Sequence, residues 1–130
     1  MMVVDASAIV AILLDEPERE LFYEMLLATP AVLSPVGYWE AAVRVEGVLG
    51  PDGRKKMDRL LEQLSVVVMP ATGQTANLAV EAERRFGKRT SAKLNLGDCF
   101  AYALAREQNA PLLYKGEDFC LTDVASVLED

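Results

Sequence analysis

Two aspartates follow short apolar runs that are long enough to form buried strands. Asp5 follows Met1–Val4, and Asp118 follows the run 112–114 after a short polar turn. In open α/β folds the ligand site lies at the carboxyl ends of the strands, so both side chains are expected at one edge of one sheet. The simpler alternatives are that Asp5 only caps the next helix, and that the adjacent Glu117 takes the place of Asp118.

A third acid, Glu40, lies in a predicted helix at a position where a charge is unusual. The apolar stripe of that helix contains Val36, Trp39 and Val43, and Glu40 falls on the same stripe. Its carboxylate is therefore predicted to point toward the core. A buried carboxylate must be protonated, paired with a cation or bound to a metal, and Arg44, one turn later, is the alternative partner.

The fourth acid, Asp98, lies in the first turn of a predicted helix that is capped by Asn95 and shares a face with Ala101 and Tyr102. The Asn-x-x-Asp spacing has two interpretations. It forms a capping box, in which the two side chains satisfy backbone N–H groups at the start of the helix, or it supplies a metal ligand there. The residues alone leave both interpretations open.

Taken together, Asp5, Glu40, Asp98 and Asp118 come from four separate segments and are predicted to reach one edge of one small sheet. Carboxylates that crowd together repel one another unless a cation lies between them. An all-oxygen ligand set suits Mg²⁺ or Mn²⁺ rather than zinc. Because Mg²⁺ activates water and stabilises charge on a phosphodiester, the four acids indicate a nuclease. Ser7 either supports this site by orienting water or a phosphate oxygen, or serves as a second helix cap.

The absence of histidine narrows the possible chemistry further. The chain contains no histidine at all, which excludes serine–histidine triads and histidine-ligated zinc. Its two cysteines, Cys99 and Cys120, do not have the CxxC spacing of a metal site. Catalysis must then depend on carboxylates, lysine, hydroxyls or thiols.

The elements that would position these acids alternate between short apolar runs and helical patterns. Strands are predicted at 1–4, 31–33, 66–69 and 112–114, and the run 66–69 is expected to be buried on both faces. Helices are predicted at 8–14 and in the segments that begin at Pro17, Ser34, the break 50–53, Thr72 and Asn95. This order predicts an α/β fold, a three-layer α/β/α sandwich with a short parallel sheet of four to five strands, the tail adding a short edge strand.

Size and composition predict one domain spanning 1–130. The 130 residues are 52% hydrophobic and 25% charged, which is typical of globular proteins. The apolar stretch 8–14 is shorter than the roughly 20 residues that a membrane span needs, and Asp5 interrupts any signal peptide. We therefore expect a cytoplasmic protein without a membrane association and with reduced cysteines.

Basic residues are concentrated just before Asp98, although the chain is acidic overall. The net charge of −7 argues against a protein whose main role is to coat nucleic acid. The segment 84–93 nevertheless contains five basic residues and no acid, namely Arg84, Arg85, Lys88, Arg89 and Lys93. These residues are candidates for contacts with RNA phosphates, and a solvated helix face is the alternative. A second basic cluster at 54–59 is a weaker candidate.

Four blocks of the chain, in this order and at these separations, resemble the VapC-type toxins of the PIN-domain family. The blocks are Val3–Ala8, Trp39–Glu40, Leu94–Ala103 and Leu113–Phe119. The resemblance implies a three-layer α/β/α fold and Mg²⁺-dependent endoribonuclease activity on an RNA substrate. It also implies a homodimer that is neutralised by a cognate antitoxin, as the toxin of a bacterial toxin-antitoxin pair.

The resemblance also assigns roles to the acids. It makes Asp5 and Asp98 the principal metal ligands, Glu40 a further ligand or a water-positioning acid, and Asp118 the fourth acid. One departure is that relatives often have His-Pro shortly before the position of Asn95, where this chain reads Thr-Ser-Ala-Lys. That difference bears on the substrate rather than on the acids.

Three other classes of protein compete with this interpretation. A haloacid-dehalogenase-like phosphatase needs Asp-x-Asp, but Ser7 stands at the second position. A receiver-like domain needs an acceptor aspartate after the central strand, where this chain has Pro70. A PIN-like scaffold without activity, acting only as a protein- or RNA-binding module, is the remaining alternative, and the presence of all four acids argues against it.

Overall fold

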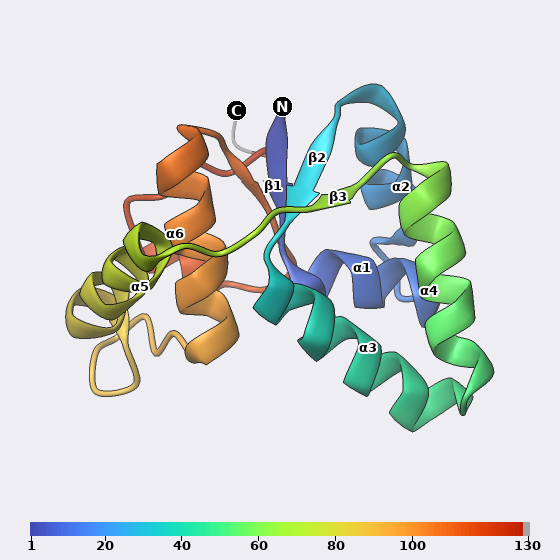
Figure 1. Cartoon of the computed structure of the whole chain (residues 1–130), viewed down its shortest axis with the longest axis horizontal. Coiled ribbons are helices and arrows are strands. Elements are labelled where there is room, and N and C mark those ends of the chain that lie inside the picture. Colours follow the sequence, from blue (N-terminus) through green and yellow to red (C-terminus); the bar gives the residue numbers. More distant parts are fainter. Residues whose placement is uncertain (129–130) are drawn as a thin grey trace.

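A parallel sheet of four short strands lies at the centre of the part of the chain that this computed structural model describes, residues 1–128 (Figure 1). The strands are β1 (Met2–Val4), β2 (Ala31–Leu33), β3 (Val67–Val68) and β4 (Leu112–Leu113). The predicted domain, 1–130, ends two residues later, and those two lie outside the described residues.

Helices cover both faces of this sheet (Figure 1). They are α1 (Ala6–Leu13), α2 (Arg19–Ala28), α3 (Pro35–Leu49), α4 (Asp52–Gln63), α5 (Gly73–Phe86), α6 (Leu96–Gln108) and the 3₁₀ helix η1 (Asp118–Leu121). Within residues 1–128, no helix is both long and apolar enough to cross a lipid bilayer.

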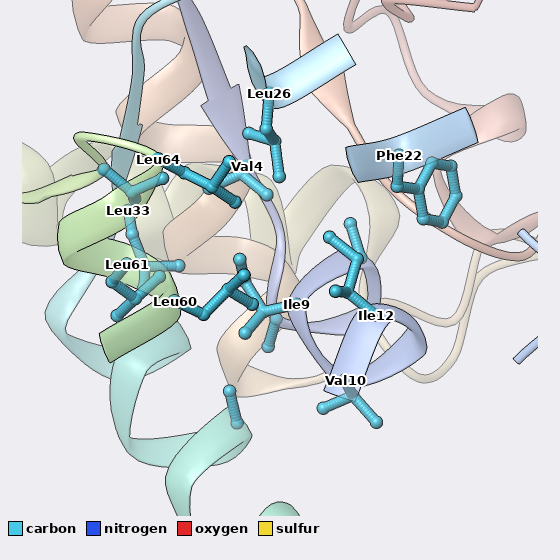
Figure 2. Packing of buried hydrophobic residues seen from close by; sticks show 14 of the residues in the cluster. Val4, Ile9, Val10, Ile12, Phe22, Leu26, Leu33, Leu60, Leu61 and Leu64 are labelled. Atoms are coloured by element: carbon cyan, nitrogen blue, oxygen red, sulfur yellow. The ribbon is translucent and has the colours of Figure 1, made fainter. Parts of the chain in front are cut away.

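Alternating side chains along the strands divide the core into two layers. Val4 and Leu33 pack with the apolar faces of α1, α2, α3 and α4. Figure 2 shows both among labelled side chains of α1, α2 and α4. Val3, Val32 and Leu112 point to the opposite face, where they pack with α5 and α6. Because neighbouring residues of a strand point to opposite faces, such short strands fill two layers at once. The predicted three-layer α/β/α sandwich with a parallel sheet is confirmed.

The strand order β3-β2-β1-β4 places β1 in the middle of the sheet. Val4 is in register with Leu113 of β4, and the Asp5 N–H donates to the Leu113 carbonyl oxygen at 2.8 Å. The chain therefore leaves β1 and β4 at the same edge. This register puts Asp5 beside the segment that leads from β4 to Asp118, as the two strand ends predict.

The prediction that the run 66–69 forms a strand buried on both faces is wrong. β3 contains only Val67 and Val68, lies at the edge of the sheet and pairs with β2 alone. Val67 is 58% exposed. A run of β-branched residues suits any pleated strand, so it does not distinguish a central strand from an edge strand. In the tail, Ser126 makes an isolated parallel bridge to Leu112 where a short edge strand was predicted.

The two positions Val3 and Val67 allow a matched test of this core. We expect Val3→Ala, in the central strand and 0% exposed, to lower the free energy of unfolding by about 2 kcal/mol, because it removes buried methyl groups and leaves a cavity. The same substitution at Val67 should cost less than about 1 kcal/mol. Urea denaturation measures both, and equal losses at the two positions would contradict the assignment of β3 as an exposed edge.

Candidate active site

Asp5 is the N-cap of α1, and its carboxylate is buried, with the residue 5% exposed. One oxygen, Oδ2, accepts two hydrogen bonds from Ser7, at 3.0 Å from the backbone N–H and at 2.6 Å from the hydroxyl. The Ser7 hydroxyl in turn accepts the Lys115 backbone N–H at 2.9 Å. Ser7 is thus not a second cap. It lies in the first turn of α1 and connects Asp5 to the segment after β4.

Glu40 is half-buried on α3, but not for the reason that the apolar stripe suggested. Trp39 and Val43 are 63% and 51% exposed, and the buried positions of α3 are Gly37, Ala41, Ala42 and Val45. The stripe prediction is therefore wrong about which face meets the core. Glu40 is covered because α3 packs against α6.

The close approach of Glu40 to α6 depends on Gly97. A Cβ built on Gly97 would overlap the Glu40 carboxylate, so any other residue there would displace it. Gly97 immediately precedes Asp98 in the first turn of α6. A glycine at this position therefore brings the acid of α3 next to the acid of α6. The sequence analysis did not identify Gly97, because only the packing of the two helices shows its role.

Asp98 takes part in a complete capping box with Asn95. The Asn95 N–H donates to Asp98 Oδ2 at 3.1 Å, and the Asp98 N–H donates to Asn95 Oδ1 at 2.8 Å. The capping interpretation is confirmed, and it leaves the other carboxylate oxygen, Oδ1, without a hydrogen-bond partner in the part of the chain that the structure describes. A cap and a ligand are thus compatible at this residue.

Asp118 is the first residue of η1 and is exposed. It lines the same cavity as Asp5 and Asp98, whereas the adjacent Glu117 does not. Of the two neighbouring acids that the sequence offered after β4, the structure therefore favours Asp118 as the fourth acid.

One cavity of about 480 Å³, at the carboxyl ends of β1 and β4, collects the side chains of all four predicted acids. Ser7, Glu16, Arg44, Asn95 and Lys115 also line it. Among residues 1–128, however, no three carboxylate or thiol side chains stand close enough together to hold one ion. The fold thus brings the four acids to a common cavity without arranging three of them as a preformed coordination sphere.

The acids of this cavity shift one another's pKa values upward. Burial, followed by repulsion from Asp5 and Asp98, raises the pKa of Glu40 to about 7. Burial also raises the pKa of Asp98 to about 6, with repulsion from Asp5 and Asp118 adding to it and Lys88 opposing it. Burial raises the pKa of Asp5 as well, although the hydrogen bonds from Ser7 lower it in part. Negative charge in this cavity is therefore costly.

Lys115 lines the cavity but is held by two other acids. Its Nζ lies 2.9 Å from Glu16 and 3.3 Å from Glu18. No ion pair within residues 1–128 joins a cation to Asp5 or Glu40. The sequence analysis did not foresee this pairing, because Glu16 and Lys115 are 99 positions apart.

The donor set fits a magnesium ion. All four side chains offer hard oxygen ligands, which Mg²⁺ prefers. Mg²⁺ also keeps several waters and uses only one or two protein carboxylates directly, so it does not require three acids in contact. Asp5 and Asp98 are fixed by hydrogen bonds, while the Glu40 and Asp118 carboxylates have no hydrogen-bond or ion-pair partner in the described part of the chain. A divalent cation would also offset the repulsion that adds to the effect of burial on the three pKa values.

The five basic residues of the segment 84–93 are exposed, but they are not equivalent. Three have acidic partners, with Arg84 at 3.9 Å from Glu81, Arg85 at 3.2 Å from Asp123, and Arg89 at 3.2 Å from Glu83. Lys88 and Lys93 have no ion-pair partner within residues 1–128. Lys88 also lowers the pKa of Asp98, so its ammonium group acts on the carboxylate cavity.

Comparisons with known proteins agree with this fold. A family model described as PIN domain matches residues 2–125. The chain is 45% identical to "Ribonuclease VapC" of Mycolicibacterium smegmatis, over 97% of this chain and 99% of the relative. It is 41% identical to "Ribonuclease VapC30" of Mycobacterium tuberculosis, over 97% and 98%.

Solved structures show the same fold at low sequence identity. The crystal structure of Mycobacterium tuberculosis VapC20, titled a sarcin-ricin loop cleaving toxin, matches with a TM-score of 0.81 at 15% identity, covering 98% of each chain. The structure of FitAcB from Neisseria gonorrhoeae matches with a TM-score of 0.69 at 19% identity, covering 97% of this chain and 96% of that one. By sequence and by fold, the chain therefore belongs to the PIN-domain family, and the curated relatives compared above are named VapC ribonucleases.

Proposed function

We propose that this protein is a divalent-metal-dependent endoribonuclease of the VapC type, with Asp5, Glu40, Asp98 and Asp118 as its catalytic acids. The observation that carries the proposal is that four separate segments deliver these carboxylates to one cavity. The PIN-domain match and the curated relatives named VapC ribonucleases support the same activity.

Asp5 and Asp98 would be the principal ligands of Mg²⁺ or Mn²⁺, with Glu40 and Asp118 contributing directly or through water. When bound, the cation supplies positive charge that lowers the pKa of water and stabilises the charge that develops on a phosphodiester. The hydroxyl of Ser7 and the backbone of Asn95 keep the two principal carboxylates in fixed orientations.

Glu40 is suited to hold the proton of the attacking water, because its carboxylate lines the cavity beside Asp98 and has no hydrogen-bond or ion-pair partner in the described part of the chain. In this step the water oxygen bonds to phosphorus, the bond from phosphorus to the leaving ribose oxygen breaks, the water proton passes to the Glu40 carboxylate, and the leaving oxygen takes up a proton from solvent. Gly97 supports the step indirectly, since it allows the carboxylate to approach α6.

The basic segment 84–93 is the proposed contact for RNA phosphates. Lys88 and Lys93 are its most available members, since Arg84, Arg85 and Arg89 have acidic neighbours. The exposed ion pairs of these three arginines are weak, so RNA phosphates can compete for them.

Partners and location rest on the family relationship. A cognate antitoxin is the proposed protein partner, and it would inhibit cleavage by filling or distorting the acidic groove. The homodimer and the cytoplasmic location expected from the sequence stay predictions, as does a role in a bacterial toxin-antitoxin pair.

The first prediction concerns the metal-dependent reaction. Purified protein should cleave labelled RNA in the presence of Mg²⁺ or Mn²⁺ and stop when a chelator is added. Asp98→Asn should lower the rate on the order of 100-fold or more, because it removes charge where the cation binds while retaining a capping side chain. Glu117→Gln is the matched control, one residue from Asp118 but outside the cavity, and should cleave at the normal rate.

Two outcomes would count against this prediction. Cleavage that continues in the presence of chelator would show that the reaction does not need a divalent cation. Equal cleavage rates for wild type and Asp98→Asn would show that the Asp98 carboxylate does not contribute to the reaction. An inactive scaffold would bind RNA or protein in the same assays without cutting RNA under any metal condition.

The second prediction concerns the free energy stored in the cavity. The pKa of Glu40 is raised from 4.5 to about 7 in the folded protein. The protonated carboxyl group therefore contributes its full share to the free energy of unfolding below the pKa of the unfolded chain, and this share is lost as pH rises through about 7. In chelator near pH 8, Glu40→Gln should therefore be more stable than wild type by roughly 1–2 kcal/mol, and near pH 4, below the unfolded pKa, the two should be nearly equal.

Urea denaturation at the two pH values measures this difference. Saturating Mg²⁺ should stabilise the wild type more than Glu40→Gln, because a ligand that binds the folded state shifts the unfolding equilibrium by mass action. A Glu40→Gln variant that is less stable than wild type near pH 8 would show that the carboxylate is not strained by its neighbours.

A further inference from the structure

Arg44 lines the carboxylate cavity and carries a positive charge, but the reaction proposed above does not use it. It lies one turn after Glu40 on α3, so the two side chains share a helical face. Arg44 is exposed, yet it lines the same cavity as the four acids. Its guanidinium group is therefore available at the mouth of the site.

Arg44 does not neutralise Glu40, which was its simplest role from the sequence. Among residues 1–128 no ion pair joins the two side chains. The pKa of Glu40 is raised by burial and by Asp5 and Asp98, and Arg44 is not among the groups that act on it. A guanidinium group paired with the Glu40 carboxylate would lower that pKa instead.

The other cation that lines the cavity, Lys115, is already occupied. Its two close contacts to Glu16 and Glu18 hold it at the junction of the α1–α2 and β4–η1 segments. Arg44 has no comparable acid partner in the described part of the chain. Of the two cations that line the cavity there, Arg44 is thus the one left for a ligand from outside the protein.

We propose that Arg44 binds an RNA phosphate next to the four carboxylates and positions the substrate from the α3 side. This inference rests on the proposed ribonuclease activity and adds a substrate-binding residue to it. An acidic cavity repels a polyanion, so a cation at its edge is needed to offset that repulsion where the backbone enters. Arginine is suited to this role, because its planar group donates two parallel hydrogen bonds to phosphate.

The placement of Lys88 gives the RNA backbone a direction across the site. Lys88 lies on the segment that joins α5 and α6, whereas Arg44 approaches the cavity from α3. In Figure 1 that segment and α3 extend to opposite sides of the carboxyl ends of the strands. A strand of RNA held at both places would pass over the carboxylates between them.

RNA binding tests the proposal independently of cleavage. Both proteins carry Asp98→Asn to keep the RNA intact, and one also carries Arg44→Ala. Fluorescence anisotropy with a labelled single-stranded RNA, over a range of KCl concentrations, should show about tenfold weaker binding without Arg44. The slope of log affinity against log salt should fall by about 0.7, the value for one phosphate contact on a single strand.

Arg19→Ala in the same background is the matched control. Arg19 is exposed on α2, carries the same charge, belongs to neither basic cluster and does not line the cavity. Its loss should change neither the affinity by more than about twofold nor the salt slope, which separates a specific contact from a change in net charge.

Cleavage kinetics in the active protein provide the second measurement. Arg44→Ala should lower kcat/KM by on the order of 10- to 100-fold, Arg44→Lys should recover part of this loss, and melting temperatures should stay equal because Arg44 is exposed. If RNA affinity, salt slope and kcat/KM all match the wild type, the proposal is overturned, and a role toward a protein partner would then be measured as weaker antitoxin binding. A wild type that binds RNA through Arg44 but does not cut it would instead reject only the proposed activity.

Discussion

Repulsion between carboxylates in a small cavity is the constraint on which the site depends. Asp5, Glu40 and Asp98 all have raised pKa values, chiefly because burial removes water from them, and neighbouring acids of the cavity add to each shift: Asp118 to that of Asp5, Asp5 and Asp98 to that of Glu40, and Asp5 and Asp118 to that of Asp98. A fold gains nothing in stability from such an arrangement. The elements around the cavity therefore have to hold the acids in place against their mutual repulsion, and the hydrogen bonds of the site are arranged to do so.

Helix caps supply much of this restraint. Asp5 and Asp98 looked from the sequence like either caps or ligands, but the structure shows that capping does not use up the carboxylate. Asp98 uses Oδ2 for the Asn95 N–H, and Asp5 uses Oδ2 for Ser7. Donors at a helix start favour negative charge, so they fix each carboxylate and offset part of the cost of its burial. Helix capping and metal binding are therefore compatible roles for the same carboxylate.

Residues placed by the ends of strands could be predicted from the sequence. Residues whose position depends on contacts between separate elements could not. Asp5 and Asp118 were placed correctly, because the exits of parallel strands lie at one edge. The run 66–69 was misassigned, since its residue types do not reveal how many neighbours a strand has. Glu40 lines the cavity as predicted, although the prediction named the wrong face of α3 as the buried one. Gly97 was not identified from the sequence. Both outcomes depend on how α3 meets α6, which no periodicity within one helix can show.

The acidic net charge is compatible with an RNA substrate only because cations are placed locally. An exposed ion pair contributes little stability, so the arginines of the segment 84–93 remain able to exchange their partners for phosphates. Lys115 differs, because Glu16 and Glu18 both hold it and it fastens the segment after β4 to the segment after α1. Charge around the cavity is thus divided by function. Lys115 stabilises the segments that form the cavity wall, and Arg44, which has no ion-pair partner in the described part of the chain, is the cation proposed for the substrate.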